Sequence, residues 1–96
     1  MALQIETPEP KIEVYYEMLK EVHNLLLVTK SEIARLRNVK ARCRDQRNIT
    51  KLDDRINDLT KVRMYLENVV KYARKCRREG YLDEAIEVLK EVLGNV

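Results

Sequence analysis

The stretch that decides the fold runs from Lys11 to Glu79 and reads KIEVYYEMLKEVHNLLLVTKSEIARLRNVKARCRDQRNITKLDDRINDLTKVRMYLENVVKYARKCRRE. It contains no proline and no glycine, because Pro8 and Pro10 precede it and both glycines follow it. Turns and strand edges usually draw on these two residue types. Their absence predicts an all-α fold, an antiparallel bundle of three to four helices in which long helices are joined by tight connections.

The composition bounds the domain organisation. The chain has 96 residues, of which 45% are apolar and 36% are charged, and it lacks Trp and Phe. A chain of this length forms one small domain, and its core must be built from Leu, Ile, Val and Met. We expect residues 1–8 to form a flexible N-terminal tail and residues 9–96 to form a single helical-bundle domain.

The first helix is expected over residues 9–47. Apolar residues recur with a heptad rhythm over residues 12–43, which is typical of a helix that packs against another helix. A competing signal lies in the middle, where residues 29–32 (TKSE) have the pattern of a capping box. That interpretation breaks the helix near residue 29 and starts another one there. We favour a continuous or kinked helix, because the apolar run 25–28 would make a poorly solvated loop.

The next break is expected at residues 48–50, because Asn and Thr are good helix caps. A second long helix is then expected over residues 50–79. Its apolar residues keep a three–four spacing over residues 52–76, which indicates one buried face. We expect this stripe to pack against residues 12–43.

A short final helix is expected over residues 83–94, after Gly80, which is a favourable residue just past a helix end. Residues 66–93 resemble one tetratricopeptide-type helical hairpin, whose signature is a small residue in the first helix, a glycine at its end and an alanine five residues later. Here these residues are Ala73, Gly80 and Ala85. The resemblance implies a C-terminal hairpin that serves as an interaction scaffold. The alternative, without any relationship to that family, is that Gly80 ends a helix and Ala85 packs at a tight crossing.

Basic residues are concentrated in the middle of the chain. Residues 30–78 hold sixteen bases and six acids, a local net charge of +10. Clustered bases neutralise phosphates and release counterions, so a basic stripe along one helix face can hold nucleic acid. The alternative is a solvated face that is balanced by Asp53, Asp54 and Asp58 and by the helix dipoles. The nucleic-acid candidates are Arg37, Lys40, Arg44, Arg47, Arg74, Lys75 and Arg78.

Tyrosine is the only aromatic residue type in the chain, and it supplies most of the candidate protein interface. Tyrosine is enriched at interfaces, and the tyrosines of the long first helix favour binding to another protein or to a second copy as a helical homodimer. Ordinary packing at the edge of the core is the alternative. The protein-interface candidates are Tyr15, Tyr16, Tyr65, Tyr72 and Leu89.

Residues that could carry chemistry are few. His23 is the only histidine, which makes it a poor metal-ligand candidate. Cys43 and Cys76 are expected as buried free thiols, because an antiparallel hairpin that turns near residue 49 keeps them far apart. The chain has no Ser-His-Asp set and no Gly-rich phosphate loop. We therefore expect no catalytic residue, no cofactor and no metal site.

Three hypotheses for the function follow. The first is a non-enzymatic interaction module, an adaptor or assembly subunit that binds another protein or itself through a helical face. The second is a small nucleic-acid-binding protein that uses the basic stripe, and the third is an engineered helical scaffold without native activity. The chain has no signal-peptide pattern and no apolar run near the roughly 18 residues of a membrane span. We therefore expect a cytoplasmic protein that has no membrane or small-molecule partner.

Overall fold

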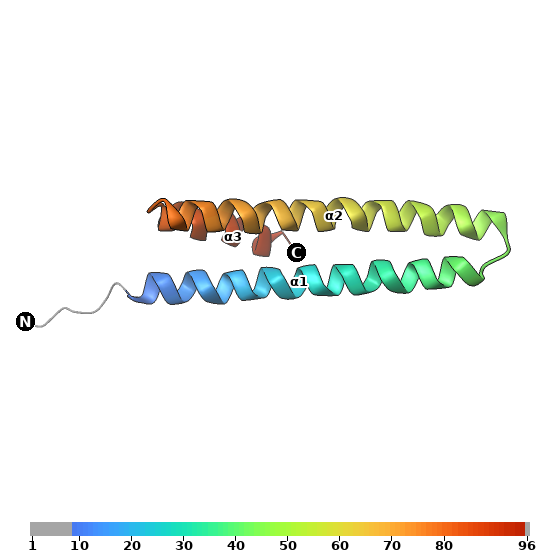
Figure 1. The fold of residues 1–96 in the computed structure, drawn as a ribbon, viewed down its shortest axis with the longest axis horizontal. Coiled ribbons are helices and arrows are strands. Elements are labelled where there is room, and N and C mark those ends of the chain that lie inside the picture. The colour runs from blue at the N-terminus through green and yellow to red at the C-terminus, as the bar shows by residue number, and fades with distance from the viewer. Residues whose placement is uncertain (1–8, 96) are drawn as a thin grey trace, which may run out of the picture. The chain divides into compact units, whose positions relative to one another are not determined.

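The computed structural model describes residues 9–95 and consists of three helices, α1 (Glu9–Arg42), α2 (Gln46–Arg78) and α3 (Leu82–Gly94) (Figure 1). These residues contain no strand. The predicted all-α class and the long helices are therefore confirmed. The predicted tail over residues 1–8 lies outside the described part of the chain.

The helix α1 is continuous, as the favoured interpretation predicted. Thr29 does not cap a second helix. Its hydroxyl donates a hydrogen bond of 2.8 Å to the carbonyl oxygen of Leu25, one turn earlier, and its side chain is buried. A threonine inside a helix commonly satisfies its hydroxyl in this way. The capping-box interpretation is therefore wrong, because this hydroxyl bonds within an unbroken helix.

The turn between the two long helices lies at residues 43–45, not at 48–50 as predicted. Asp45 caps α2, because its carboxylate accepts a 3.0 Å hydrogen bond from the backbone N–H of Arg47. Thr50 lies inside α2, where its hydroxyl donates to the carbonyl oxygen of Gln46. The sequence offered several capping residues within a few positions, and the carboxylate was the one that the fold used.

The described residues form two compact units. The three-helix unit contains residues 9–24 and 68–95, and the two-helix unit contains residues 25–67. In both units α1 and α2 run antiparallel, because a residue later in α1 pairs with a residue earlier in α2. In the three-helix unit Tyr15 lies beside Arg77, and His23 lies beside Arg74. Lys30 pairs with Glu67, and Lys40 pairs with Asp53.

The three-helix unit has a continuous core to which all three helices contribute. In this unit α3 contributes Ala85 and Leu89, which are both 0% exposed, and Val92. Lys11 of α1 forms a 3.0 Å ion pair with Asp83 at the start of α3. The buried apolar residues from α1 and α2 are Tyr15, Leu19, Val22, Val69, Val70, Ala73 and Cys76.

Gly80 connects α2 to α3, as the sequence predicted. Its φ of +90° is the left-handed conformation that glycine adopts without strain. The N–H of Tyr81 donates to the carbonyl of Cys76 at 2.7 Å, and the N–H of Gly80 donates to that of Arg77 at 3.2 Å. This pair of bonds is the Schellman motif, which satisfies carbonyls that a helix end leaves open. The motif reverses the chain and returns α3 to the three-helix unit.

The two-helix unit has a thinner core. Ile33 and Leu36 of α1 pack with Ile56 of α2, and Leu52 and Leu59 lie half-buried against them. The unit contains parts of α1 and α2 only. A pair of helices buries the seam between them but leaves the two outer sides of that seam to solvent. Apolar residues on those sides are therefore exposed.

Candidate functional site

Five side chains from α1 and α2 meet on the three-helix unit. Arg77 lies against two aromatic rings, with its guanidinium carbon 5.9 Å from the ring centre of Tyr15 and 5.4 Å from that of Tyr16. The two rings meet edge to face, with centres 5.1 Å apart and planes at 69°. Both distances allow cation–π attraction. We name the group the tyrosine–arginine cluster; its members are Tyr15, Tyr16, Arg74, Arg77 and Arg78.

The two tyrosines of this cluster have different roles. Tyr15 is only 1% exposed, and burial raises the pKa of its hydroxyl while the charge of Arg77 acts in the opposite direction. It is therefore a neutral core residue, and its ring lies beside the guanidinium group of Arg77. Tyr16 is 50% exposed and is accessible from solvent.

A surface pocket of about 320 Å³ lies at this cluster and is also lined by Leu19. A terminal nitrogen of Arg74 lies 3.4 Å from Nε2 of His23, which holds the guanidinium against α1. Among the described side chains, none of the three arginines of the cluster has a carboxylate within ion-pair distance. Three guanidinium groups thus border one small pocket without a described counter-charge.

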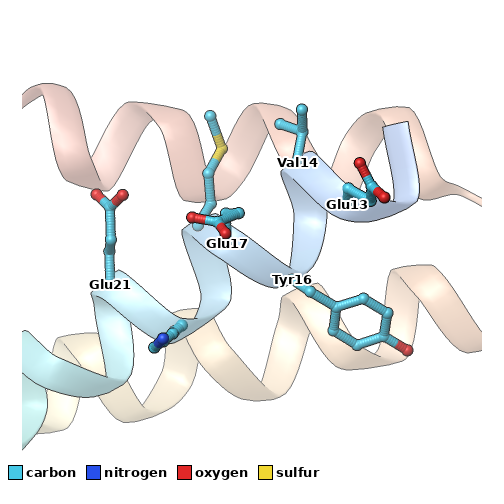
Figure 2. Close-up of a pocket in the computed structure, with 7 residues that line it drawn as sticks. Glu13, Val14, Tyr16, Glu17 and Glu21 are labelled. Atoms are coloured by element: carbon cyan, nitrogen blue, oxygen red, sulfur yellow. The ribbon is translucent and has the colours of Figure 1, made fainter. Parts of the chain in front are cut away.

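A second surface of α1 in this unit carries several carboxylates and borders the cluster at Tyr16. Figure 2 shows Val14, Glu17 and Glu21 pointing to one side of α1, whereas the ring of Tyr16 points to the other. A broad groove of about 810 Å³ runs past these carboxylates and that of Glu13. In the three-helix unit the carboxylates come from α1 and the arginines of the cluster come from α2, and Tyr16 lines both surfaces.

The predicted basic stripe of residues 37–47 is divided by the turn. Arg37 is exposed on α1, Arg44 is exposed in the turn and Arg47 is exposed at the start of α2. Lys40 forms an ion pair with Asp53, which the sequence analysis had named as a balancing acid. The prediction of one stripe along one helix face is wrong, because α1 ends at Arg42. The remaining candidate, Lys75, is exposed in the last turn of α2.

The remaining interface candidates lie in different environments. Leu89 is a core residue of the three-helix unit and is not accessible to a partner there. Tyr72 is exposed in that unit, and its hydroxyl lies 3.3 Å from a carboxylate oxygen of Glu84 on α3. The pKa of the Tyr72 hydroxyl is raised, first by the neighbouring Cys76 thiol and to a smaller extent by the charge of Glu84. Tyr65 is 51% exposed in the two-helix unit.

Four exposed apolar residues share one side of the two-helix unit. Glu32 of α1 and Arg55 of α2 each precede a buried residue, Ile33 or Ile56, by one position, which places them on the same side of the antiparallel seam. The charge of Arg55 also lowers the pKa of Glu32, after the larger effect of Arg35. Residues four or seven positions apart share a helix face, which places Val28 and Val39 beside Glu32. On α2, Val62 lies seven positions after Arg55, and Tyr65 lies three positions after Val62, so both lie on that side of the unit. We name this surface the apolar face; its members are Val28, Val39, Val62 and Tyr65.

Arg77 was not among the predicted site residues, and its contact with the tyrosines of α1 was not predicted. The signal that could have found it is the register of the hairpin. The pairs observed between α1 and α2 have residue numbers that sum to 92–97, as for Tyr16 with Arg77, Lys30 with Glu67 and Lys40 with Asp53. This register brings Tyr15 opposite the segment that contains Arg77.

Neither a metal site nor a membrane span is found within the described part. Residues 9–95 contain no group of three His, Cys, Asp or Glu side chains arranged to hold a metal ion. None of the described helices is long and apolar enough to cross a bilayer. Both cysteines are free thiols, with Cys76 buried and Cys43 half-buried at the turn.

Comparisons with known proteins identify no relative: no protein-family model, no curated protein and no solved structure matches this chain.

Proposed function

We propose that the chain is a non-enzymatic helical interaction module whose two-helix unit is completed by an acidic amphipathic helix of another protein. The partner helix would lie on the apolar face and cover Val28, Val39, Val62 and Tyr65. In the three-helix unit α3 covers the seam between α1 and α2 within the same chain. In the two-helix unit a helix of another protein would cover the seam in the same way.

The exposure of the apolar face carries this proposal. Four large apolar side chains lie on one side of a two-helix seam, and Leu52 and Leu59 are only half-buried in that seam. Burying apolar surface contributes about 25 cal/mol per Å², so a helix that covers these residues gains free energy from each of them. Tyrosine adds an aromatic contact of the kind that is enriched at protein interfaces.

The net charge of the two-helix unit favours a different protein over a second copy of this chain as the partner. Residues 25–67 hold eleven basic and six acidic residues, a net charge of +5. Two copies that met through this unit would bring like charges together, whereas an acidic helix would be attracted. The proposed partner is therefore a different protein, with carboxylates beside its apolar stripe.

The test uses a synthetic amphipathic helix with a Leu stripe flanked by Glu, and a matched peptide with Lys in place of Glu. We expect the Glu peptide to bind the full chain with a dissociation constant in the micromolar range, and Val39→Ser with Tyr65→Ser to weaken it about tenfold. The matched control is Tyr81→Ser, because Tyr81 is similarly exposed but lies in the three-helix unit. Equal binding of both peptides, or equal loss in the control, would contradict the proposal.

Light scattering on a sizing column tests the competing functions with the same protein. A dimer that is lost in Tyr65→Ser would favour self-association. Co-elution with a labelled oligonucleotide at about 50 mM salt that disappears at about 300 mM would favour nucleic-acid binding through Arg37, Arg44 and Arg47. If the Glu peptide does not bind, either result would contradict the proposed function and favour the competing one. The relationship to tetratricopeptide modules, the single-domain organisation and the cytoplasmic location stay predictions.

A further inference from the structure

We propose that the tyrosine–arginine cluster binds a single phosphomonoester dianion, carried as a phosphorylated side chain by a protein partner. This site is on the three-helix unit and is separate from the apolar face of the two-helix unit. That the phosphoryl group is carried by a protein rests on the proposed function, whereas the chemistry of the pocket does not.

Arg77 is held in place before any ligand arrives. Its guanidinium lies against the rings of Tyr15 and Tyr16. A cation–π contact uses no N–H group as a hydrogen-bond donor to a carboxylate, so the donors of Arg77 stay available to an oxyanion. Tyr15 is buried, so its ring offers Arg77 a packed surface on one side. A pre-positioned arginine loses less side-chain entropy when it binds an oxyanion.

Arg74 and Arg78 complete the donor set. They are four positions apart in α2 and therefore share a helix face, with Arg77 beside them on the same pocket. Arginine donates two parallel hydrogen bonds to a phosphate, which neither a lysine nor a neutral donor can match. Three arginines thus offer enough N–H groups for all three terminal oxygens of a phosphomonoester.

The charge of the pocket is not cancelled within the described structure. Lys11, Lys30 and Lys40 each pair with a carboxylate, but the three arginines of the cluster have no such partner among the described side chains. The last turn of α2 contributes about half a negative charge through its open carbonyls. Three full positive charges exceed that amount several times, so the pocket retains a net attraction for a dianion.

The surroundings favour one phosphoryl group over a nucleic-acid backbone. The pocket, at about 320 Å³, is large enough for one such group and its first attached atoms. Glu13, Glu17 and Glu21 line the neighbouring groove on α1, and Figure 2 shows Glu17 and Glu21 pointing away from the ring of Tyr16. A polyanion that extended beyond the pocket around α1 would meet these carboxylates, whereas a single dianion would not.

The test is an NMR titration of the full-length protein with a short peptide that contains one phosphoserine, with the unphosphorylated peptide and with an oligothymidine. We expect the phosphopeptide alone to shift the signals of the Arg74, Arg77 and Arg78 side chains and of the Tyr16 amide. The double substitution Arg74→Gln with Arg78→Gln should weaken its binding about tenfold, since hydrogen bonds to charged groups contribute strongly. The matched control, Arg37→Gln with Arg44→Gln, should leave the affinity unchanged.

A second variant separates geometry from charge. Arg77→Lys keeps the positive charge but removes the planar fork, so we expect it to weaken binding of the phosphopeptide by a few-fold while the protein stays folded. Absence of shifts at the cluster, or equal weakening in the control, would overturn the site. Tighter binding of the oligothymidine than of the phosphopeptide would overturn the protein-borne ligand. Because Tyr65→Ser leaves this pocket intact, a failed Glu-peptide test would not by itself remove binding here.

Discussion

The two units of this protein use the same pair of helices and differ by the presence of α3. Where α3 is present, Leu89 and Val22 are 0% exposed and the core is continuous across three helices. Where it is absent, Ile33, Leu36 and Ile56 are buried but the adjacent Leu52 and Leu59 are only half-buried. An antiparallel pair can bury its seam, and a third helix is needed to cover either side of it. This difference is the basis of the proposal that a helix of another protein covers the two-helix unit.

Truncation of a core residue supplied by α3 should give the largest effect. Leu89→Ala is expected to destabilise the protein by about 2–5 kcal/mol, because it leaves a cavity at a fully buried position. Leu52→Ala, at a half-buried position of the two-helix unit, should cost clearly less. Urea denaturation followed by circular dichroism gives both values. Equal losses would show that the two units are packed alike.

The reversal of the chain before α3 should be sensitive to one backbone conformation. Gly80→Ala is expected to cost about 1–2 kcal/mol, because Gly80 has a φ of +90° that disfavours a residue with a Cβ atom. No atom lies within 4 Å of the added Cβ, so the cost is conformational and not a clash. Thermal unfolding of Gly80→Ala measures it, with Gly94→Ala as the control. A stabilised Gly80→Ala protein would contradict the left-handed turn.

The residue that caps α2 distinguishes the observed turn at residues 43–45 from the predicted turn at residues 48–50. Asp45→Ala is expected to cost about 1 kcal/mol, because the N–H of Arg47 loses its carboxylate acceptor. Asn48→Ala should change the free energy of unfolding by less than about half as much, since Asn48 is exposed inside the helix and not at its cap. Urea titrations of both variants decide the point. A larger loss at Asn48 would place the turn where the sequence analysis expected it.

The smallest expected change in stability comes from replacing Arg63, a charged residue of the two-helix unit. Nε of Arg63 is buried and has no hydrogen-bond partner among the described residues, and it lies 4.0 Å from a carboxylate oxygen of Glu67. Replacing a poorly satisfied buried polar group with an apolar one of similar length is often neutral or favourable. Arg63→Met is therefore expected to stabilise the protein by up to about 1 kcal/mol, because Lys30 still pairs with Glu67. A loss of stability in calorimetry would show that Arg63 contributes to the fold.

The sequence predicted the helices well because the residues that decide them are local. The missing prolines and glycines between residues 11 and 79 set the long helices, and Gly80 set the end of α2. The turn before α2 was misplaced because Asp45, Asn48 and Thr50 are all acceptable caps. Only the packing of α1 against α2 selects among them.

The candidate site depended on contacts between α1 and α2. The sequence analysis had named Tyr15 and Tyr16 for one function and Arg74 and Arg78 for another, and the structure brings all four to one pocket. Arg77, which contacts both rings, was missed. Contacts between distant segments follow from how α1 and α2 pack against each other, which local patterns do not determine. Local patterns therefore found most of the residues but not their assembly.

The measurement that most directly tests the openness of the two-helix unit is native-state amide hydrogen exchange of the full-length protein. The account predicts that amides of residues 69–76, in the three-helix unit, exchange at least about tenfold more slowly than those of residues 52–59, as less complete burial lowers the local free energy of opening. Adding the Glu peptide should slow exchange at residues 52–59 selectively. Equal protection of both segments, with no response to the peptide, would contradict the account.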